Sequence, residues 1–474
     1  MLYSINLTGF TLEDDEGAYL YASWRAAEGE SLYSEIPVAQ SPALFWFGAF
    51  IFKVAPPIFL AARAASVIAA LLSLLFMFLW AKKLLPSIYA AAAALLLTLN
   101  PIFFTMARFF RPEIFMLALM LAALFLYEKA DDPENSKHSL KWLVASSALF
   151  AFSALFKPIS ALIPAAIILY RAFNRRWKES LALLLPSALI GAVAFGYLLA
   201  ASPDALSLTA GQHLSYYKER TLIEHMLATF RFFGRVLSLE WPLWLPAIAG
   251  AILWDRKNGG RGKNRRLMLI AFIVTPVFFF AVKRELYPRH LFYLAPILSI
   301  LAVRFAILLQ PAGAREMGRV ISIAVLALII SANPPPVGLW KLKENETACL
   351  ASLVTAKTSP SERVFADYAQ INFAAKRRGI RATPYLSQGA IVSGKLTSQT
   401  ILEEIGENKP ILVLIHESGG VKAPYGSEIY TFEPSHLYSL SDFELFKERL
   451  REKYPREELI TCDKRTYRVF SALK

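Results

Sequence analysis

Long apolar runs between residues 59 and 333 constrain the fold of this chain more than any other feature of its sequence. Several of them are long enough to cross the roughly 30 Å hydrocarbon core of a bilayer as a helix. Hydrophobic residues make up 55% of the 474-residue chain, which agrees with this interpretation. The sequence therefore predicts an α-helical polytopic membrane protein. We place about ten spans by apolar run and helix breaker, near 59–81, 86–104, 113–128, 140–156, 158–172, 180–200, 236–253, 267–282, 289–309 and 318–333.

Lysine and arginine collect in the loops on one side of these spans, and this distribution orients the chain in a cell membrane. Because cytoplasmic loops are usually basic, we assign that side to the cytoplasm. The N-terminal segment, the loop at 201–235 and everything after Pro334 then face the extracytoplasmic side. The same loops account for the formal charge of +14, so we expect membrane lipids and no nucleic acid as partners. They contain Lys82, Lys83, Arg171, Arg175, Arg176, Lys178, Arg256, Lys257, Arg261, Lys263, Arg265, Arg266, Arg315 and Arg319.

Composition divides the chain into three parts. Residues 1–58 form an acidic loop with two semi-amphipathic stretches, 18–28 and 42–54, which we expect along the outer membrane interface because they are short for a crossing. Residues 59–333 form the transmembrane bundle. The charged segment 334–474, which opens with three prolines, alternates helix and strand signals. We expect it to form a small extracytoplasmic α/β domain.

Within this last part, buried strands are predicted at 363–368 and 410–416. Helical patterns at 346–357, 398–408 and 440–453 lie between or around them. The chain has two cysteines, Cys349 and Cys462, without the spacing of a metal site. Whether they form a disulfide is left open at this point.

An acidic cluster, Asp14, Asp15 and Glu16, stands just ahead of the apolar spans. Carboxylates at a membrane interface are costly unless they are used. They could cap an interfacial helix that begins near Gly17, since acidic residues are favoured at helix N-termini. The alternative, which we favour, is that the cluster is catalytic.

Basic residues also occur at turns on the predicted extracytoplasmic side, where lysine and arginine are usually few. They are a second indication of a functional site. Arg108 and Arg111 precede the span near Glu113, Lys157 lies at an outward hairpin, and a further turn carries Lys283, Arg284, Arg289 and His290. Outward cations at bundle ends can bind the phosphate of a membrane lipid through charge-assisted hydrogen bonds. Each could instead snorkel to headgroups, and Glu113 could simply pair with Arg108 or Arg111.

A lipid phosphate on the same face as a carboxylate cluster indicates group transfer. The phosphate would be the leaving group, and one carboxylate would remove a proton from an acceptor hydroxyl or amine. This chemistry is glycosyl transfer from a lipid-linked donor, with Asp15 as the base and a cation offsetting charge on the departing phosphate. A single displacement by the acceptor predicts inversion at the anomeric carbon.

Residues 12–19 (LEDDEGAY), followed by Ala22 and residues 29–33 (GESLY), resemble a first-loop pattern with an Asp-Glu pair, a Tyr and a Gly-x-x-x-Tyr element. This pattern is similar to that of the GT-C membrane glycosyltransferases, particularly protein O-mannosyltransferases and aminoarabinose-lipid A transferases. Residues 41–44 (SPAL) resemble the next element, Lys-Pro-Pro-Leu, but Ser41 and Ala43 depart from it. Similar recurring positions are Ala62-Arg63, Ala107-Arg108, Arg111-Pro112-Glu113, Lys157-Pro158, Tyr287-Pro288-Arg289-His290 and Tyr293-Leu294-Ala295-Pro296.

The resemblance implies a GT-C-like fold and a polyprenyl-phosphate sugar as the donor substrate. It carries the family's catalytic base onto Asp15, with Glu16 beside it and Asp14 as a rival. By position it implies donor phosphate binding by Arg111, Lys157 and Arg289, with His290 as a further candidate. Arg108, Glu113 and Tyr287 are the remaining candidate site residues.

One departure concerns the N-terminus. Relatives usually have a transmembrane helix before the acidic loop, whereas about a dozen residues precede Glu13 here, with no run long enough to cross. We expect the start of the chain to have been assigned too late.

Two other classes of function remain open on this evidence. A transporter or flippase of an anionic isoprenoid lipid would use the same basic turns without chemistry. A non-catalytic membrane subunit would use the α/β domain to dock partners. The sugar and the extracytoplasmic acceptor, whether protein, lipid or polysaccharide, are not determined by the sequence. A divalent metal also stays open, because carboxylates cluster but no histidine-rich ligand set requires one.

Overall fold

The computed structural model describes residues 7, 14–211, 221–258, 269–282, 286–309, 327–328, 331, 346–418, 435–462 and 465–472. Most of the predicted span at 318–333 lies outside these residues, as do the first two residues of the span at 267–282. Lys283 and Arg284 of the predicted outward turn also lie outside them.

The described part of the chain is mostly helical. Two short helices come first, α1 (Asp14–Ala27) and α2 (Ala43–Val54), close to the two stretches predicted for the interface. The bundle follows, with the 3-10 segments η2 (Pro158–Ala161) and η5 (Pro288–Leu294) at two of its helix starts. Its helices are α3 (Phe59–Ala81), α4 (Ser87–Leu99), α5 (Pro101–Met106), α6 (Pro112–Ala130), α7 (Ser139–Phe156), α8 (Leu162–Phe173), α9 (Trp177–Ala201), α11 (Leu222–Asn258), α13 (Thr275–Ala281) and α14 (Ala295–Leu308).

Among the described residues, five helices are long and apolar enough to cross a membrane. The chain is therefore a membrane protein with several apolar helices, as predicted, and the exact number of spans stays a prediction. The predicted run at 86–104 is divided into α4 and α5, because Asn100 caps the second helix ahead of Pro101. The five helical stretches are Phe59–Ala81, Ser139–Phe156, Trp177–Ala201, Leu222–Leu253 and Pro288–Leu308.

The central helix of the bundle is α6, which is buried on nearly all sides and packs against α3 and α7. Its contact with α7 includes two serine hydroxyls that donate to carbonyl oxygens of α6. Ser146 donates to Ala123 over 2.8 Å and Ser153 donates to Met116 over 2.9 Å. Small polar side chains of this kind let two apolar helices approach closely while their hydroxyls remain hydrogen-bonded. The residues at both ends of α6 are thus held in place by a packed helix.

The C-terminal residues form a four-stranded sheet with helices around it. The strand order is β1-β2-β4-β3, and β1 pairs parallel to β2 while the other pairs are antiparallel. Strands β1 (Val364–Ala366) and β2 (Leu412–Ser418) lie at the two predicted strand positions, whereas the hairpin of β3 (Arg456–Cys462) and β4 (Arg465–Ser471) was not predicted. The helices of this region are α16 (Glu346–Lys357), α17 (Ala369–Ala375), α18 (Gln388–Val392), α19 (Ser398–Asn408) and α20 (Phe443–Lys453).

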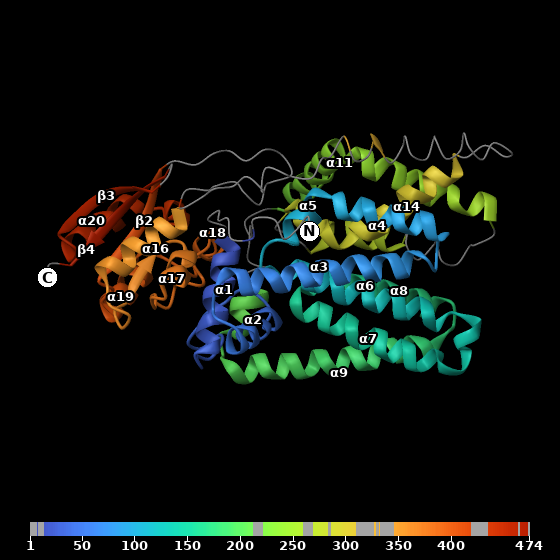
Figure 1. Cartoon of the computed structure of the whole chain (residues 1–474), viewed down its shortest axis with the longest axis horizontal. Coiled ribbons are helices and arrows are strands. Elements are labelled where there is room, and N and C mark those ends of the chain that lie inside the picture. The colour runs from blue at the N-terminus through green and yellow to red at the C-terminus, as the bar shows by residue number, and fades with distance from the viewer. Residues whose placement is uncertain are drawn as a thin grey trace.

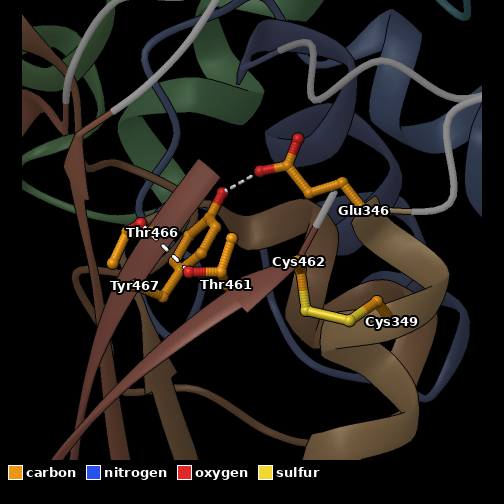
Figure 2. The surroundings of a disulfide bond; sticks show 6 residues. All are labelled: Glu346, Cys349, Thr461, Cys462, Thr466 and Tyr467. Atoms are coloured by element: carbon orange, nitrogen blue, oxygen red, sulfur yellow. Dashed lines mark hydrogen bonds between the residues drawn. A yellow bond between two sulfur atoms is a disulfide. The ribbon is translucent and has the colours of Figure 1, made fainter. Parts of the chain in front are cut away.

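A disulfide between Cys349 and Cys462 joins α16 to the end of β3 (Figure 2). Close to it, the Tyr467 hydroxyl donates to Glu346 over 2.5 Å, so α16 is tied to the sheet by a covalent bond and a hydrogen bond. The sheet region lies at one end of the helical bundle, and α1 and α2 lie where the two meet (Figure 1). There α17 packs directly against α1.

Candidate active site

The N-terminal end of α1 carries the acidic cluster, in which Glu16 is more enclosed than Asp15. Glu16 is fully buried, and its two oxygens accept from Arg63 Nε and Nη2 over 2.9 and 2.5 Å. It also accepts from the backbone amide of Phe110 over 2.9 Å. Three donors on one buried carboxylate hold α1 against α3 and against the segment that leads into α6. Glu16 thus lies beside Asp15 in a position suited to anchoring the helix.

Asp15 points in a different direction and remains about one-third exposed. Its carboxylate forms an ion pair with Arg111 and lies 3.5 Å from Arg289 Nη2. These two cations come from segments 96 and 274 residues further along the chain. Asp14 begins α1, and its side chain lies outside the part of the chain that the structure describes.

Ion pairs continue from Arg111 along the start of α6. Arg111 Nε lies 3.5 Å from Glu113 Oε2, and Lys157 pairs with the other oxygen of Glu113. We call the connected set Asp15, Arg111, Glu113, Lys157 and Arg289 the Asp15 network. All five of its members were predicted as candidate site residues, and the fold brings them together.

Prolines explain why these cations converge. Arg111 and Lys157 each precede a proline, as does Tyr287 two residues before Arg289, and all three pre-proline residues have extended backbone. The proline ring disfavours the helical region for the residue before it and is itself suited to the first position of a helix. Each of these positions is therefore a helix start, and the three starts lie at the same end of the bundle as α1.

The remaining candidates lie around this network. The Arg289 guanidinium lies 4.6 Å from the centre of the Tyr287 ring, and the buried His290 ring lies 5.7 Å from the same ring. Tyr287 thus contacts both neighbours. Arg108 is buried, and its guanidinium lies 5.9 Å from the ring of Phe104.

Arg63 is a residue of the site region to which the sequence analysis assigned no role. It is the single charged residue of α3, it is 2% exposed, and it binds Glu16 and the carbonyl oxygen of Leu7. A lone arginine in an otherwise apolar helix is costly and usually has a specific partner. That signal could have paired it with the acidic cluster.

The Asp15 network contains three cations and two carboxylates, so its formal charge is +1. Arg111 and Glu113 are almost fully buried, whereas Asp15 and Arg289 retain exposed surface. In a setting with little water, such cations bind an oxyanion more strongly than they would in bulk solvent. Among the described residues, no group of three or more His, Cys, Asp and Glu side chains could hold a metal ion. The three cations beside Asp15 make the network suited to an anionic group next to a carboxylate.

Comparison with known proteins supports the fold. Residues 39–201 match the family model of dolichyl-phosphate-mannose-protein mannosyltransferase. No curated protein sequence matches the chain.

Solved structures match over almost the whole length. ArnT from Cupriavidus metallidurans bound to undecaprenyl phosphate is 14% identical with a TM-score of 0.66, covering 99% of this chain and 95% of that one. The apo form of ArnT is 13% identical with a TM-score of 0.62, covering 96% of this chain and 93% of that one. The Archaeoglobus fulgidus oligosaccharyltransferase tethered with an acceptor peptide containing the NVT sequon is 12% identical with a TM-score of 0.58. The match covers 95% of this chain and 69% of that one.

At these identities the likeness to solved structures is one of fold. The chain has the GT-C fold of membrane glycosyltransferases, which confirms the resemblance predicted from its sequence.

Proposed function

We propose that this chain is an integral membrane glycosyltransferase that moves a sugar from a polyprenyl-phosphate-linked donor to an extracytoplasmic acceptor. The observation that carries the proposal is the Asp15 network, in which a partly exposed carboxylate lies against cations from two other helix starts. The GT-C fold, and the undecaprenyl phosphate bound by ArnT, support a lipid-linked phosphate as the anion. The acceptor can be a protein, a lipid or a polysaccharide.

In the proposed reaction, Asp15 accepts the proton of the acceptor hydroxyl or amine as that group attacks the anomeric carbon. The bond between the anomeric carbon and the phosphate oxygen breaks, and polyprenyl phosphate leaves with the electron pair. Arg111, Lys157 and Arg289 stabilise the charge that develops on the phosphate. The acceptor attacks opposite the leaving group, so the configuration of the sugar inverts.

The ion pairs of Asp15 suit this role in two ways. Two neighbouring guanidinium groups keep the carboxylate ionised, which a base requires. The donor phosphate would compete with Asp15 for Arg289, whose contact with the carboxylate is 3.5 Å long. Donor binding would then loosen Asp15 from one cation and leave it beside the reacting carbon.

The disulfide supports an extracytoplasmic position for the C-terminal region. Cys349 and Cys462 are bonded across 113 residues of sequence. Such bonds persist in oxidising compartments and are rare in a reducing cytoplasm. Because α17 of this region packs against α1, we assign the Asp15 network to the same side of the membrane.

The experiment that tests the proposal is native mass spectrometry of the purified protein with its co-extracted lipids. We would compare the unaltered chain with Arg289→Ala and with Arg176→Ala, a matched arginine that pairs with Glu179 beyond the other end of α6. A polyprenyl-phosphate sugar should be bound by the unaltered chain and by Arg176→Ala. The bound amount should fall at least about tenfold in Arg289→Ala, since a hydrogen bond to a charged group contributes about 1.5–3 kcal/mol.

Two results would contradict the proposal. Bulk phospholipids alone, bound equally by all three proteins, would remove the evidence for the donor and favour a scaffold. The second result would come from the rate at which the protein moves a polyprenyl lipid across the bilayer of a vesicle. If Asp15→Asn moved the lipid as fast as the unaltered chain, the protein would be a transporter.

A further inference from the structure

Helix α1 is contacted from the C-terminal region along one continuous face. Gly17, Tyr21 and Trp24 are spaced so that they lie on the same side of the helix. All three contact residues 370–379, which comprise most of α17 and the turn after it. Gly17 is two residues from Asp15, so this contact begins directly beside the acidic cluster.

The closest approach is between Gly17 and Gln370. A Cβ atom at position 17 would lie 2.6 Å from Gln370 Cβ and 2.8 Å from its backbone nitrogen. Gln370 is fully buried and donates from its amide to Thr347 in α16 over 3.1 Å. Backbone atoms cannot move aside as a flexible side chain can, so glycine is required for this distance between the helices.

Further along α1, a hydrogen bond and an aromatic cluster complete the contact. The Tyr21 hydroxyl accepts from the backbone amide of Gly379 over 2.7 Å. Phe373 of α17 is fully buried, with ring centres of Trp24, Phe52 and Phe59 at 6.4, 5.5 and 5.0 Å. These three rings come from α1, α2 and α3, so one side chain of the C-terminal region joins the first three helices.

We propose that α17 is a positioning element of the active site, which sets the distance of Asp15 from the cations through Gly17, Gln370 and Phe373. This inference rests on the proposed function, in which Asp15 is the base. Glu16 holds α1 from the bundle side, and α17 holds it from the opposite region, so Asp15 is located by both. Displacing a reacting group by about 1 Å can cost about 100-fold in rate.

This role differs from acceptor recognition, which was the expected contribution of the C-terminal region. A region that only recognises the acceptor would change the KM for the acceptor when altered. A positioning element changes kcat, while the KM for the donor stays the same because Arg111, Lys157 and Arg289 lie outside the altered contact. Comparing the change in kcat with the change in the KM for the acceptor therefore distinguishes positioning of Asp15 from acceptor recognition.

The first test compares Gly17→Ala with Gly191→Ala in the full chain. Both glycines are helical, but no heavy atom lies within 4 Å of a Cβ built at Gly191. Release of polyprenyl phosphate from the donor would be measured in membranes that supply the native acceptors. We expect Gly17→Ala to lower kcat at least tenfold with a donor KM within twofold, and Gly191→Ala to leave both within twofold. A kcat for Gly17→Ala within twofold of the unaltered value would overturn the proposal.

The second test needs no activity and so separates this inference from the proposed function. Hydrogen exchange of the amides of residues 15–27 would be compared between Phe373→Ala and Phe446→Ala. Both phenylalanines are fully buried in the C-terminal region, but Phe446 lies in the core between the sheet and α20. We expect exchange in α1 to be at least tenfold faster in Phe373→Ala alone.

Equal exchange of α1 in the two variants would overturn the positioning role. If the unaltered chain transferred no sugar while exchange responded as expected, the proposed function would fail and the structural role of α17 would stand.

Discussion

The two ends of α6 carry ion-pair networks that contain similar residues but are completed differently. At its N-terminal end lies the Asp15 network. At its C-terminal end, about 28 Å away by the helical rise, Arg171 pairs with Asp131 and Glu179, and Arg176 pairs with Glu179. We call Asp131, Arg171, Arg176 and Glu179 the Arg171 network.

Charge balance distinguishes the two. The Arg171 network has two cations and two carboxylates, and its buried arginine also donates to the Tyr127 hydroxyl over 2.9 Å. The Asp15 network has three cations and two carboxylates. Buried ion pairs contribute little net stability because desolvation offsets their attraction. Among the described residues, the excess of cations in the Asp15 network suits an anionic ligand.

The two networks also differ in how far apart their ion-pair partners lie in the sequence. Arg171 lies 40 residues from its partner Asp131 and 8 residues from its partner Glu179. Asp15 reaches partners in the bundle from a separate helix that α2, α3 and α17 hold in place. The Arg171 network thus lies within residues 131–179, whereas the Asp15 network joins helix starts from α1 to η5.

The largest expected effect is that of Asp15→Asn. Loss of a general base lowers kcat by about 10²–10⁴-fold, while donor binding should persist because the three cations remain. Release of polyprenyl phosphate from the donor measures the first and native mass spectrometry the second. As a control, Asp132→Asn, which removes a partly exposed ion pair with Lys83, should leave kcat within twofold. Equal loss of activity and donor binding in Asp15→Asn would indicate misfolding or a misassigned base.

Glu16→Gln should have the next largest effect, on the free energy of unfolding. Removing one partner of a buried ion pair costs about 3–5 kcal/mol, and here the Arg63 guanidinium loses the carboxylate that it contacts. Glu179→Gln should cost less, because Arg171 keeps Asp131 as a partner. Thermal unfolding in detergent measures both. If the two variants unfold at the same temperature, the Glu16 pair does not anchor α1 in the way inferred here.

Lys157→Gln should lower donor affinity by about tenfold, from the loss of one charge-assisted hydrogen bond. Lys129→Gln is a matched control near the other end of α6, where Lys129 Nζ lies 3.9 Å from the centre of the Trp142 ring. Binding of undecaprenyl phosphate to the purified variants measures the difference. Equal affinities would mean that the excess charge of the Asp15 network does not serve a phosphate.

The last prediction concerns a cation outside both networks. Burial lowers the pKa of Lys376 to about 8, while Glu28 opposes the shift. In the part of the chain that the structure describes, Lys376 forms no ion pair with a carboxylate; it donates to the Pro57 carbonyl and lies over Phe373.

The unfolded chain keeps this proton up to about pH 10.5, so the unfolding free energy should rise with pH between about 8 and 10.5. Unfolding of Lys376→Met across this pH window should lack this rise. Lys357→Met, which leaves Lys376 in place, should keep it. Identical pH dependence in Lys376→Met and the unaltered chain would show that Lys376 is not buried enough to matter.

The amino-acid sequence alone predicts the local features of this protein. Apolar runs predict helices because a membrane span needs consecutive apolar residues. Prolines after Arg111 and Lys157 mark helix starts because they restrict the backbone at and before their own positions. The acidic cluster and the outward cations were recognisable because charges beside apolar spans are costly. The residues of the Asp15 network could therefore be proposed before any contact between them was known.

The partner of each of these charged residues follows from the tertiary packing. Arg63 with Glu16, Asp15 with Arg111, and Gly17 with Gln370 join segments that no periodicity relates. The hairpin of β3 and β4 was also missed, because β3 is an edge strand whose exposed, charged residues lack the alternation of a half-buried strand. Short-range patterns record which face of an element is buried, but which surfaces meet depends on the packing of the complete chain.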